Sequence, residues 1–323
     1  MIVITGAAGF IGSCIVAKLN ELDRSDLILV DHFDGDGDAK HANLHGKRYH
    51  SYFDKSDFLN AIQFDRFKEN VTCALHMGAC SSTTLQDEQY FKENNLQYSC
   101  HMAEWAAKIK ARFIYASSAA TYGEPANNYR DDEAAIRACK PLNLYGESKQ
   151  KFDEWILDHG LQTKVVGLKF FNVFGPNEYH KGDMRSVVAK AYGRAAKEGK
   201  IALFKSYSDD YADGEQQRDF IYVKDVVDIV LFFVEHERIN GIFNVGTGLA
   251  RTWNDLANAL FTAVGKSSNI EYIPMPEVLR GKYQYFTQAD MSKLRSIGYD
   301  KPFTDLETAV KDYVGYLKQH LYW

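Results

Sequence analysis

A short apolar segment followed at once by three evenly spaced glycines stands at the start of the sequence. Residues 2–4, Ile-Val-Ile, have no polar alternation, which predicts a strand buried on both faces. Gly6, Gly9 and Gly12 follow, and apolar residues then recur at helical spacing before a second aliphatic run ends in Asp31. This order predicts a βαβ unit with a tight glycine-rich turn at the carboxyl end of its first strand.

The predicted turn places unpaired backbone N–H groups beside the positive end of a helix, and such a pair binds phosphate. Gly6 permits the tight turn, Gly9 the close approach of a pyrophosphate, and Gly12 the close packing of helix on strand. Asp31 stands where a carboxylate accepts hydrogen bonds from a ribose. The segment therefore predicts a dinucleotide site, whereas the glycines alone also fit a tight turn that binds nothing.

Two lysines downstream of Asp31 bear on the choice between NAD and NADP. Asp31 by itself favours NAD, because a carboxylate repels a 2′-phosphate. Lys40 or Lys55 could neutralise that phosphate, although each also fits a solvated surface lysine. We expect NADP, with NAD as the alternative.

Further apolar runs alternate with amphipathic stretches along the first half of the chain. The runs predict strands at 72–77, 111–118 and 164–171, and the stretches predict helices near 88–109 and 146–158. Alternation of this kind is typical of an α/β fold with a doubly wound parallel sheet. The acidic segment 34–38 predicts a flexible loop.

From about residue 174 the elements are shorter and richer in aromatic residues, although 219–236 predicts a strand that runs into a helix of the main layer. We therefore expect two domains. The dinucleotide-binding (Rossmann) domain covers 1–173, and 214–248 returns to it. A smaller α/β substrate-binding domain covers 174–213 and 249–323.

Composition excludes several classes of partner and site. A net charge of −5 gives no reason to expect nucleic acid or an anionic membrane. No apolar run approaches the ~20 residues that span a bilayer, so we expect a cytoplasmic protein. The five cysteines are odd in number and show no CxxC spacing, so we expect neither a disulfide framework nor a metal site.

Two motifs predict acid–base chemistry. "YASSAATYG" (115–123) ends an apolar strand, and "YGESK" (145–149) opens a helix in which Tyr145 and Lys149 share one face. A lysine charge beside a phenol stabilises the phenolate and lowers the phenol pKa from its ordinary value near 10. Ser118, at the strand end, could bind the same substrate oxygen. Each motif alone also fits exposed or turn residues, but their order behind the glycine turn and Asp31 favours an enzyme.

The ordered motifs "TGAAGFIG" (5–12), "YASSAATYG" and "YGESK" resemble the extended short-chain dehydrogenase/reductase superfamily, whose nucleotide-sugar epimerases and dehydratases use a Ser/Tyr/Lys set with bound NAD(P). Within it, "GACSSTT" (78–84), "KPLNLYGESK" (140–149), "FFNVFGPNEYHKG" (170–182) and "GKYQYFTQADM" (281–291) resemble the ADP-L-glycero-D-manno-heptose 6-epimerases. This likeness runs along nearly the whole chain.

The resemblance implies an enzyme that inverts C6 of an ADP-heptose used for lipopolysaccharide inner core, by hydride transfer to bound NADP and back through a ketone. It implies Lys181 as a second acid–base group beside Tyr145, and a homo-oligomer, a pentamer by likeness. A UDP-hexose 4-epimerase or a nucleotide-sugar dehydratase is the alternative among enzymes. A non-catalytic dinucleotide sensor is the alternative outside them, and it has no need of the Tyr/Lys pair.

The resemblance also implies binding residues. The catalytic residues are Ser118, Tyr145, Lys149 and Lys181. The cofactor residues are Gly6, Gly9, Phe10, Ile11, Gly12, Asp31, His32, Lys40, Lys55, Met77, Gly78, Ala79, Cys80, Ser81, Asn94, Lys149 and Val173. The substrate residues are Ser118, Asn172, Asp183, Lys190, Phe204, Lys205, Ser206, Tyr207, Arg218 and Tyr283. Arg218 is the expected diphosphate contact, because its guanidinium offers a fixed fork of donors. Tyr207 or Tyr283 could stack on the adenine or cap the sugar.

Overall fold

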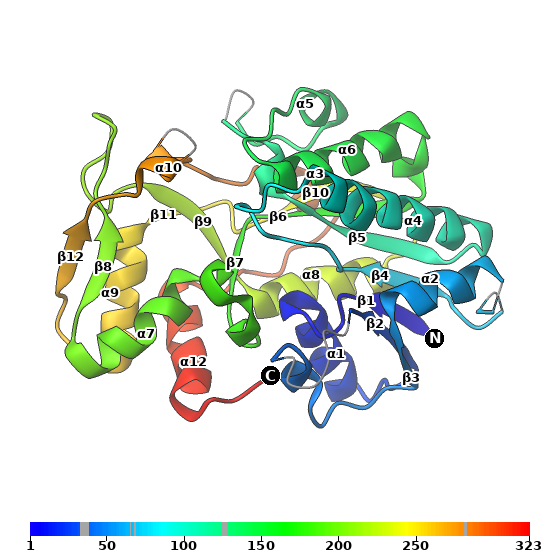
Figure 1. Cartoon of the computed structure of the whole chain (residues 1–323), viewed down its shortest axis with the longest axis horizontal. Helices are drawn as coiled ribbons and strands as arrows, with labels where there is room; N and C mark the ends of the chain where they lie inside the picture. Colours follow the sequence, from blue (N-terminus) through cyan, green and yellow to red (C-terminus); the bar gives the residue numbers. More distant parts are fainter. Residues whose placement is uncertain (33–38, 65, 68, 125–127, 281–282) are drawn as a thin grey trace.

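A seven-stranded parallel sheet forms the centre of the molecule, in the order β10-β6-β5-β4-β1-β2-β3 (Figure 1). The computed structural model describes residues 1–32, 39–64, 66–67, 69–124, 128–280 and 283–323. The strands are β1 (Ile2–Thr5), β2 (Leu27–Asp31), β3 (Ser51–Asp54), β4 (Cys73–His76), β5 (Arg112–Ser118), β6 (Val165–Phe170) and β10 (Gly241–Val245). The predicted doubly wound parallel sheet is confirmed.

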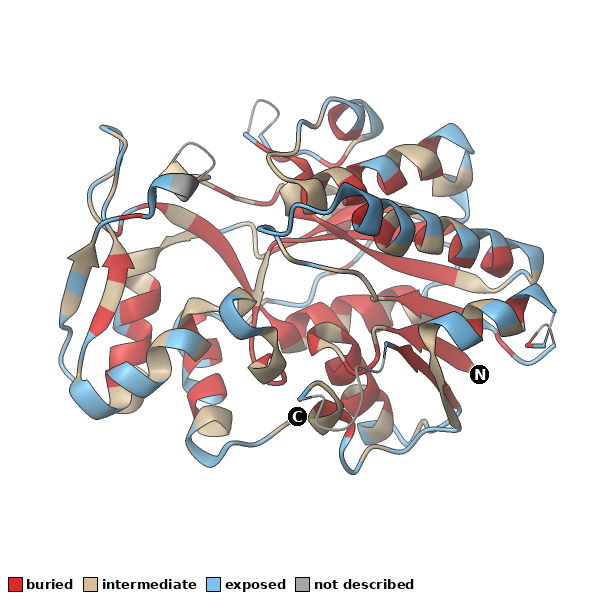
Figure 2. Ribbon diagram, in the orientation of Figure 1, coloured by how far each residue is buried: buried red, intermediate tan, exposed pale blue. Residues whose placement is uncertain are grey.

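Helices cover both faces of this sheet, which is why β1, β2, β4 and β6 are buried along their whole length (Figure 2). One face carries α1 (Phe10–Glu21) and α8 (Val223–Glu235), and the other carries α2 (Lys55–Gln63), α4 (Tyr98–Lys108) and α6 (Leu144–Asp158). Successive residues of β1 alternate between the two: Ile2 and Ile4 join the α1/α8 core, whereas Val3 joins the α2/α4/α6 core.

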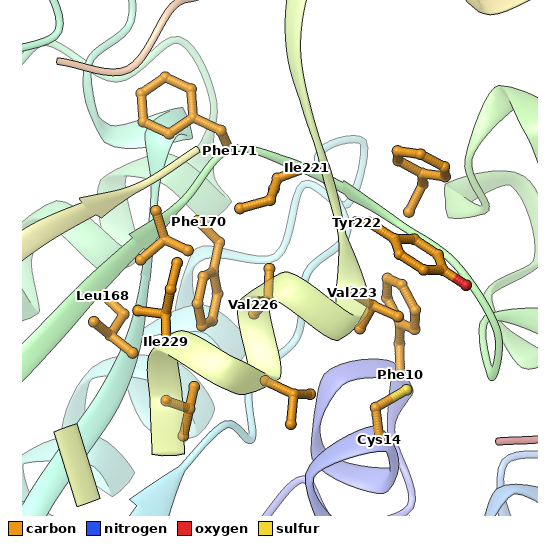
Figure 3. Close-up of a cluster of buried hydrophobic side chains, with 14 of the residues drawn as sticks. Phe10, Cys14, Leu168, Phe170, Phe171, Ile221, Tyr222, Val223, Val226 and Ile229 are labelled. Atoms are coloured by element: carbon orange, nitrogen blue, oxygen red, sulfur yellow. The ribbon is translucent and has the colours of Figure 1, made fainter. Parts of the chain in front are cut away.

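Helix α8 connects the second half of the chain to the sheet. Figure 3 shows Val226 and Ile229 of this helix close to Leu168 and Phe170 of β6, with Val223 close to Phe10 of α1. The prediction at 219–236 of a strand that runs into a helix of the main layer is therefore confirmed. The strand, β9 (Gln217–Tyr222), lies in a separate three-stranded sheet with β7 (Asn172–Phe174) and β11 (Ala250–Thr252).

Most of the remaining elements lie at the end of the molecule far from β3 (Figure 1). They are the strand pair β8 (Ile201–Phe204) and β12 (Ile270–Ile273), and the helices α7 (Val187–Glu198), α9 (Trp253–Val264) and α12 (Leu306–Gln319), which pack on one another. Three short helices are α5 (Glu133–Arg137), α10 (Glu277–Arg280) and α11 (Ser292–Ser296). The domain boundaries at 173, 214 and 248 stay a prediction.

The stretch predicted as one helix over 88–109 has three parts. These are α3 (Glu88–Phe91), a π-helical segment over Lys92–Gln97, and α4. A wider turn of this kind keeps the helix continuous while rotating the residues after it. All five cysteines are free, and the predicted acidic loop at 34–38 lies outside the described residues.

The strand order reverses between β1 and β4, which are hydrogen-bonded neighbours. The connections that follow two such strands run to opposite sides of the sheet, which leaves a crevice at the carboxyl ends of the strands. Ligands of doubly wound folds bind in this crevice. Gly6 and Gly78 follow β1 and β4, Asp31 ends β2, and Ser118 ends β5. The fold thus brings the separate sequence motifs to one edge of the sheet.

Candidate active site

The glycine-rich turn is too crowded for any other residue at two of its positions. Gly6 has φ +65°, and a Cβ there would lie 2.6 Å from the Cα of Gly78. A Cβ on Gly12 would lie 2.1 Å from the carbonyl oxygen of Gly6. Helix α1 follows Gly9 without a side-chain cap, so its first N–H groups are left for a ligand. This cradle fits the pyrophosphate of a dinucleotide.

Asp31 is buried at the end of β2 and forms an ion pair with Lys40. Its Oδ2 accepts a 2.8 Å hydrogen bond from the N–H of Ala8, and its Oδ1 accepts from the N–H of His32 at 2.8 Å and from Lys40 Nζ at 2.9 Å. The carboxylate is therefore fixed to the glycine-rich turn on one side and paired with an ammonium on the other. A ribose at this point would meet both charges.

A hollow of about 210 Å³ adjoins Asp31, Lys40 and the ends of β1 and β4. Its lining includes the predicted cofactor residues Gly6, Asp31, His32, Lys40, Lys55, Gly78, Ala79, Cys80 and Asn94. Lys55 Nζ donates a 2.7 Å hydrogen bond to Oδ1 of Asn94. Both lysines considered for a 2′-phosphate thus lie at this hollow.

The main cleft, of about 470 Å³, contains all four predicted catalytic residues. Its lining includes the predicted residues Gly6, Gly9, Phe10, Ile11, Gly12, Asp31, Lys40, Met77, Gly78, Ala79, Ser81, Ser118, Tyr145, Lys149, Val173 and Lys181. Most of these residues come from the ends of β1, β2, β4 and β5, the starts of α1 and α6, and β7 with the segment that follows it. The glycine cradle and the acid–base groups therefore share one cleft.

The start of α6 fixes Tyr145 and Lys149. The Asn143 side chain caps the helix by accepting the N–H of Gly146 at 2.9 Å, which puts Tyr145 in the first turn. Lys149 is 3% exposed and donates a 2.8 Å hydrogen bond to the carbonyl of Ala116 in β5. Burial lowers the pKa of Lys149 to about 8, against an opposing effect of the Asp153 charge.

The pKa of Tyr145 departs from its ordinary value in the direction opposite to that expected from the sequence. It is raised, because burial of the phenol outweighs its hydrogen bond with Ser118. The i, i+4 spacing predicted the shared helix face correctly, but the ammonium of Lys149 is bonded to Ala116. The lowering of the Tyr145 pKa by Lys149 is thus an expectation that burial overturns.

Lys181 reaches the cleft from a short 3-10 segment, Tyr179–Met184. Its ammonium lies 5.1 Å from the ring centroid of Phe10, at the start of α1, and burial lowers its pKa. The buried Glu178 carboxylate accepts hydrogen bonds from the N–H and the hydroxyl of Ser186, both at 2.6 Å. These hydrogen bonds join Glu178, just before the segment that carries Lys181, to Ser186, just after it.

Sequence reasoning missed a buried asparagine that joins this segment to the glycine-rich turn. Asn43 Nδ2 lies 2.8 Å from the carbonyl of Ala8 and 3.0 Å from that of Asn177, and within 3.2 Å of the His180 ring. The fully buried side chain therefore links the turn beside Asp31 to the residues directly before Lys181. No local pattern marks Asn43, because its three partners are distant in sequence.

His76, at the end of β4, was also missed. The ring is 1% exposed, with Nδ1 2.6 Å from the hydroxyl of Thr5 and Nε2 2.8 Å from that of Ser99. The Thr5 hydroxyl also accepts the N–H of Gly78 at 3.1 Å, so the ring supports the floor of the cleft. Burial lowers the pKa of His76 to about 3, and the nearby Lys149 charge acts in the same direction.

A third hollow, of about 380 Å³, lies between α7, β8 and α9. Lys190, Phe204 and Tyr283 line it as predicted substrate residues, together with Trp253, which sequence reasoning missed. Arg218 is 6% exposed, with its guanidinium 5.1 Å from the Tyr283 ring centroid and 5.7 Å from that of Trp253. It donates to backbone carbonyls of Gln217 (2.8 Å) and Gln284.

Six predicted substrate residues lie outside the linings of the three hollows described above. They are Asn172, Asp183, Lys205, Ser206, Tyr207 and Arg218. Asn172 Oδ1 accepts from the Thr287 hydroxyl at 3.4 Å, and the Asp183 carbonyl accepts from Lys190 at 3.2 Å. The ring of Tyr207 lies 4.1 Å below the guanidinium of Arg280.

Comparison with known proteins identifies the family. The model of the NAD dependent epimerase/dehydratase family matches residues 2–246. The chain belongs to this family. Over 314 residues it is 50% identical to the ADP-L-glycero-D-manno-heptose-6-epimerase of Nitratidesulfovibrio vulgaris, with 97% of each chain covered. It is 43% identical over 323 residues to the enzyme of the same name from Fusobacterium nucleatum, again with 97% of each chain covered.

Solved structures agree with this membership of the epimerase/dehydratase family. The crystal structure of Helicobacter pylori ADP-L-glycero-D-manno-heptose-6-epimerase superimposes with a TM-score of 0.80 at 29% identity, covering 98% of this chain and 96% of that one. Thermotoga maritima UDP-glucose 4-epimerase gives a TM-score of 0.80 at 26% identity, with 99% of both chains covered. The resemblance to nucleotide-sugar epimerases stated from the motifs is confirmed, and the chain is an isomerase of this family.

Family membership makes a nicotinamide dinucleotide the cofactor of this chain, and the described residues fit one. The cradle around Gly6 and Gly12 accepts a pyrophosphate at the N-terminus of α1, and Asp31 stands at the ribose position. Among the described residues, no three His, Cys, Asp or Glu side chains are grouped so that they could hold a metal ion. None of the described helices is long and apolar enough to cross a membrane.

Proposed function

We propose that this protein inverts C6 of ADP-D-glycero-D-manno-heptose, giving the L-glycero epimer used for lipopolysaccharide inner core. The observation that carries the proposal is that Tyr145 and Lys181 line the same cleft but come from different elements, α6 and the segment after β7. The names of the curated relatives at 43–50% identity support the same substrate.

Inversion at a carbinol carbon needs a proton acceptor and a proton donor that act from two sides of the carbon. The nicotinamide, when bound, supplies hydride acceptance from C6 and hydride return to the resulting ketone. We assign Tyr145 to the oxygen on one side and Lys181 to the oxygen on the other. Ser118, hydrogen-bonded to Tyr145, holds the substrate oxygen beside the phenol.

Lys149 supports Tyr145 as a charge. Its pKa of about 8 keeps the ammonium protonated below that pH, one helical turn from the phenol. The hydrogen bond to the Ala116 carbonyl fixes the ammonium at the cleft. A fixed positive charge on this helix face would stabilise the negative charge that develops on the Tyr145 oxygen during proton transfer.

The nucleotide end of the substrate fits the third hollow. Trp253 and Tyr283 provide aromatic faces there for an adenine. Lys190, which lines the same hollow, provides a cation for a diphosphate, and the guanidinium of the buried Arg218 lies 5.1 Å and 5.7 Å from the two ring centroids. We therefore place the ADP group between α7 and α9 and the heptose in the main cleft.

We further propose NADP rather than NAD as the bound cofactor. The ion pair between Lys40 and Asp31 offsets the repulsion that the carboxylate alone would exert on a 2′-phosphate. Lys55 lines the same hollow and adds a second cation. A cytoplasmic location and a pentameric assembly stay predictions.

The first test is to incubate the purified protein, without added cofactor, with ADP-D-glycero-D-manno-heptose in deuterated water and to follow C6 by NMR. We expect the L-glycero epimer without deuterium at C6, because the hydride returns from the cofactor to the same carbon. Failure to convert this sugar, with turnover of UDP-galactose instead, would refute the heptose assignment.

Variants of the two acid–base residues test the mechanism. Tyr145→Phe should lose at least 10²-fold in kcat, and Lys181→Met should lose a similar factor, while both retain the circular dichroism spectrum of the parent protein. Full activity of either variant would refute its assigned role.

A further inference from the structure

A fully buried ion pair lies behind the acid–base groups. Asp153 in α6 and Lys169 in β6 are both 0% exposed, and Asp153 Oδ2 lies 2.6 Å from Lys169 Nζ. Taking two charges out of water costs free energy that their attraction seldom exceeds, so an apolar pair of similar volume would serve packing equally well. The position of this pair therefore requires an explanation other than stability.

Asp153 continues the face of α6 that carries the acid–base residues. Tyr145, Lys149 and Asp153 are spaced at i, i+4 and i+8, which stacks them on one side of the helix. The Asp153 carboxylate accepts hydrogen bonds from the Tyr115 hydroxyl at 2.8 Å and from the Ser117 hydroxyl at 2.7 Å, both in β5. One turn beyond Lys149, the helix is thus bonded to the strand that ends in Ser118.

Lys169 extends the same network to the serine. Its ammonium donates a 2.7 Å hydrogen bond to the hydroxyl of Thr121, and that hydroxyl donates to the carbonyl of Ser118 at 2.8 Å. The ammonium also lies 5.0 Å from the ring centroid of Tyr122. The hydrogen bonds of Asp153, Lys169 and Thr121 therefore connect α6, which carries Tyr145 and Lys149, to β5, which ends in Ser118.

We propose that Asp153, Lys169 and Thr121 are positioning residues that hold Ser118, Tyr145 and Lys149 in register for proton transfer at the substrate oxygen. Hydrogen bonds between buried charged groups have narrow geometry, so the network restricts how α6 can slide along β5. This inference rests on the proposed function, because it assumes that these three residues act on one substrate oxygen.

The charge of Asp153 gives the proposal a signature that packing would not share. It raises the pKa of both Lys149 and Tyr145. Two other groups, Cys80 and Ser118, also affect the pKa of Tyr145. The remaining titratable neighbour of Lys149 is His76, whose pKa the lysine charge lowers. Removing the carboxylate charge should therefore move the loss of the Lys149 proton to lower pH.

The mildest test removes one hydroxyl. Thr121→Val keeps the shape of the side chain but removes the donor to Ser118, and Thr121→Ser restores it. We expect kcat of Thr121→Val to fall about tenfold or more, as for a small misplacement of reacting groups, with KM within about twofold. Thr121→Ser should recover most of that loss. Equal kcat values for the Val, Ser and parent proteins would overturn the proposal.

A second test exchanges the ion pair. The double variant Asp153→Asn/Lys169→Met leaves no unpaired buried charge, so its melting temperature should stay close to that of the parent protein. We expect its kcat to stay about tenfold low and the alkaline limb of its pH–rate profile to move below the parent limb near pH 8. Glu147→Gln, which breaks the exposed pair with Lys151 on the same helix, is the matched control and should change neither.

The two tests separate this inference from the proposed function. The parent protein is assayed first, and its conversion of the ADP-heptose decides the substrate. The variants are then compared with the parent on whichever nucleotide sugar the parent epimerises. A double variant with parental kcat and an unmoved alkaline limb would show that the pair is structural only.

Discussion

His76 makes the stability of this protein depend on pH near the cofactor cleft. The ring is buried between Thr5 and Ser99, and its pKa falls from 6.5 to about 3 on folding. Unfolded chains bind a proton at this histidine below about pH 6.5, whereas the folded protein does not until about pH 3. The folded state therefore loses stability as pH falls through this range.

The size of the loss follows from the difference between the two pKa values. Each pH unit below 6.5 costs about 1.36 kcal/mol, so at pH 5 the loss reaches about 2 kcal/mol. Replacement of His76 by Gln removes the titrating group and keeps a side chain that can bond to Ser99. The free energy of unfolding of His76→Gln should therefore fall by about 2 kcal/mol less than that of the parent protein between pH 7 and pH 5.

Urea unfolding followed by circular dichroism at pH 7, 6 and 5 measures this difference. His101→Gln is the matched control, because His101 lies on the exposed side of α4. The control should show the same pH dependence as the parent protein. Parallel curves for the parent and His76→Gln would refute the reasoning, since they would mean that the buried ring takes up a proton as readily as the unfolded chain.

Three further predictions concern the turn and its neighbours. Gly12→Ala should destabilise the fold by about 1–3 kcal/mol and abolish dinucleotide binding, because the added Cβ would meet the Gly6 carbonyl. The control is Gly315→Ala, in open space on α12, which should instead stabilise the fold by about 0.5–1 kcal/mol in thermal melts. Asn43→Ala should cost about 1–3 kcal/mol in urea unfolding and lower kcat as well, since it frees the segment before Lys181. Lys40→Ala should weaken NADP binding about tenfold, or ~1.4 kcal/mol, in calorimetry and leave NAD binding unchanged or tighter.

Five of the seven strands of the central sheet could be predicted from the sequence. β1, β2, β4, β5 and β6 are mostly apolar and buried, and each was predicted. The edge strand β10 was not predicted, although four of its five residues are buried. The edge strand β3 was not, because its sequence, Ser-Tyr-Phe-Asp, is only partly buried and has no apolar run. The π-helical segment at Lys92–Gln97 was not predicted either, because a wider turn shifts the apolar pattern by only one residue and the stretch stays helical on both sides of it.

The site could be predicted where its residues are neighbours in sequence or occupy fixed places in the motif order. The glycines, Asp31, Tyr145 and Lys149 belong to this group. Asn43 and His76 do not, because each acts through hydrogen bonds to residues 23 to 137 positions away. The pair of Asp153 with Lys169 depends in the same way on the packing of α6 against β6. Such contacts exist only after the sheet has formed.

The Tyr145–Lys149 pair shows how the fold changes the chemistry that local spacing predicts. Spacing alone implies that the lysine charge lowers the pKa of the phenol. Burial favours the neutral form of both side chains. The pKa of Tyr145 therefore rises, while that of Lys149 falls to about 8. The lysine therefore gives up its proton before the tyrosine does. Its charge is available to the Tyr145 oxygen only below about pH 8, and the carboxylate of Asp153, by opposing the fall in the lysine pKa, extends that range upward.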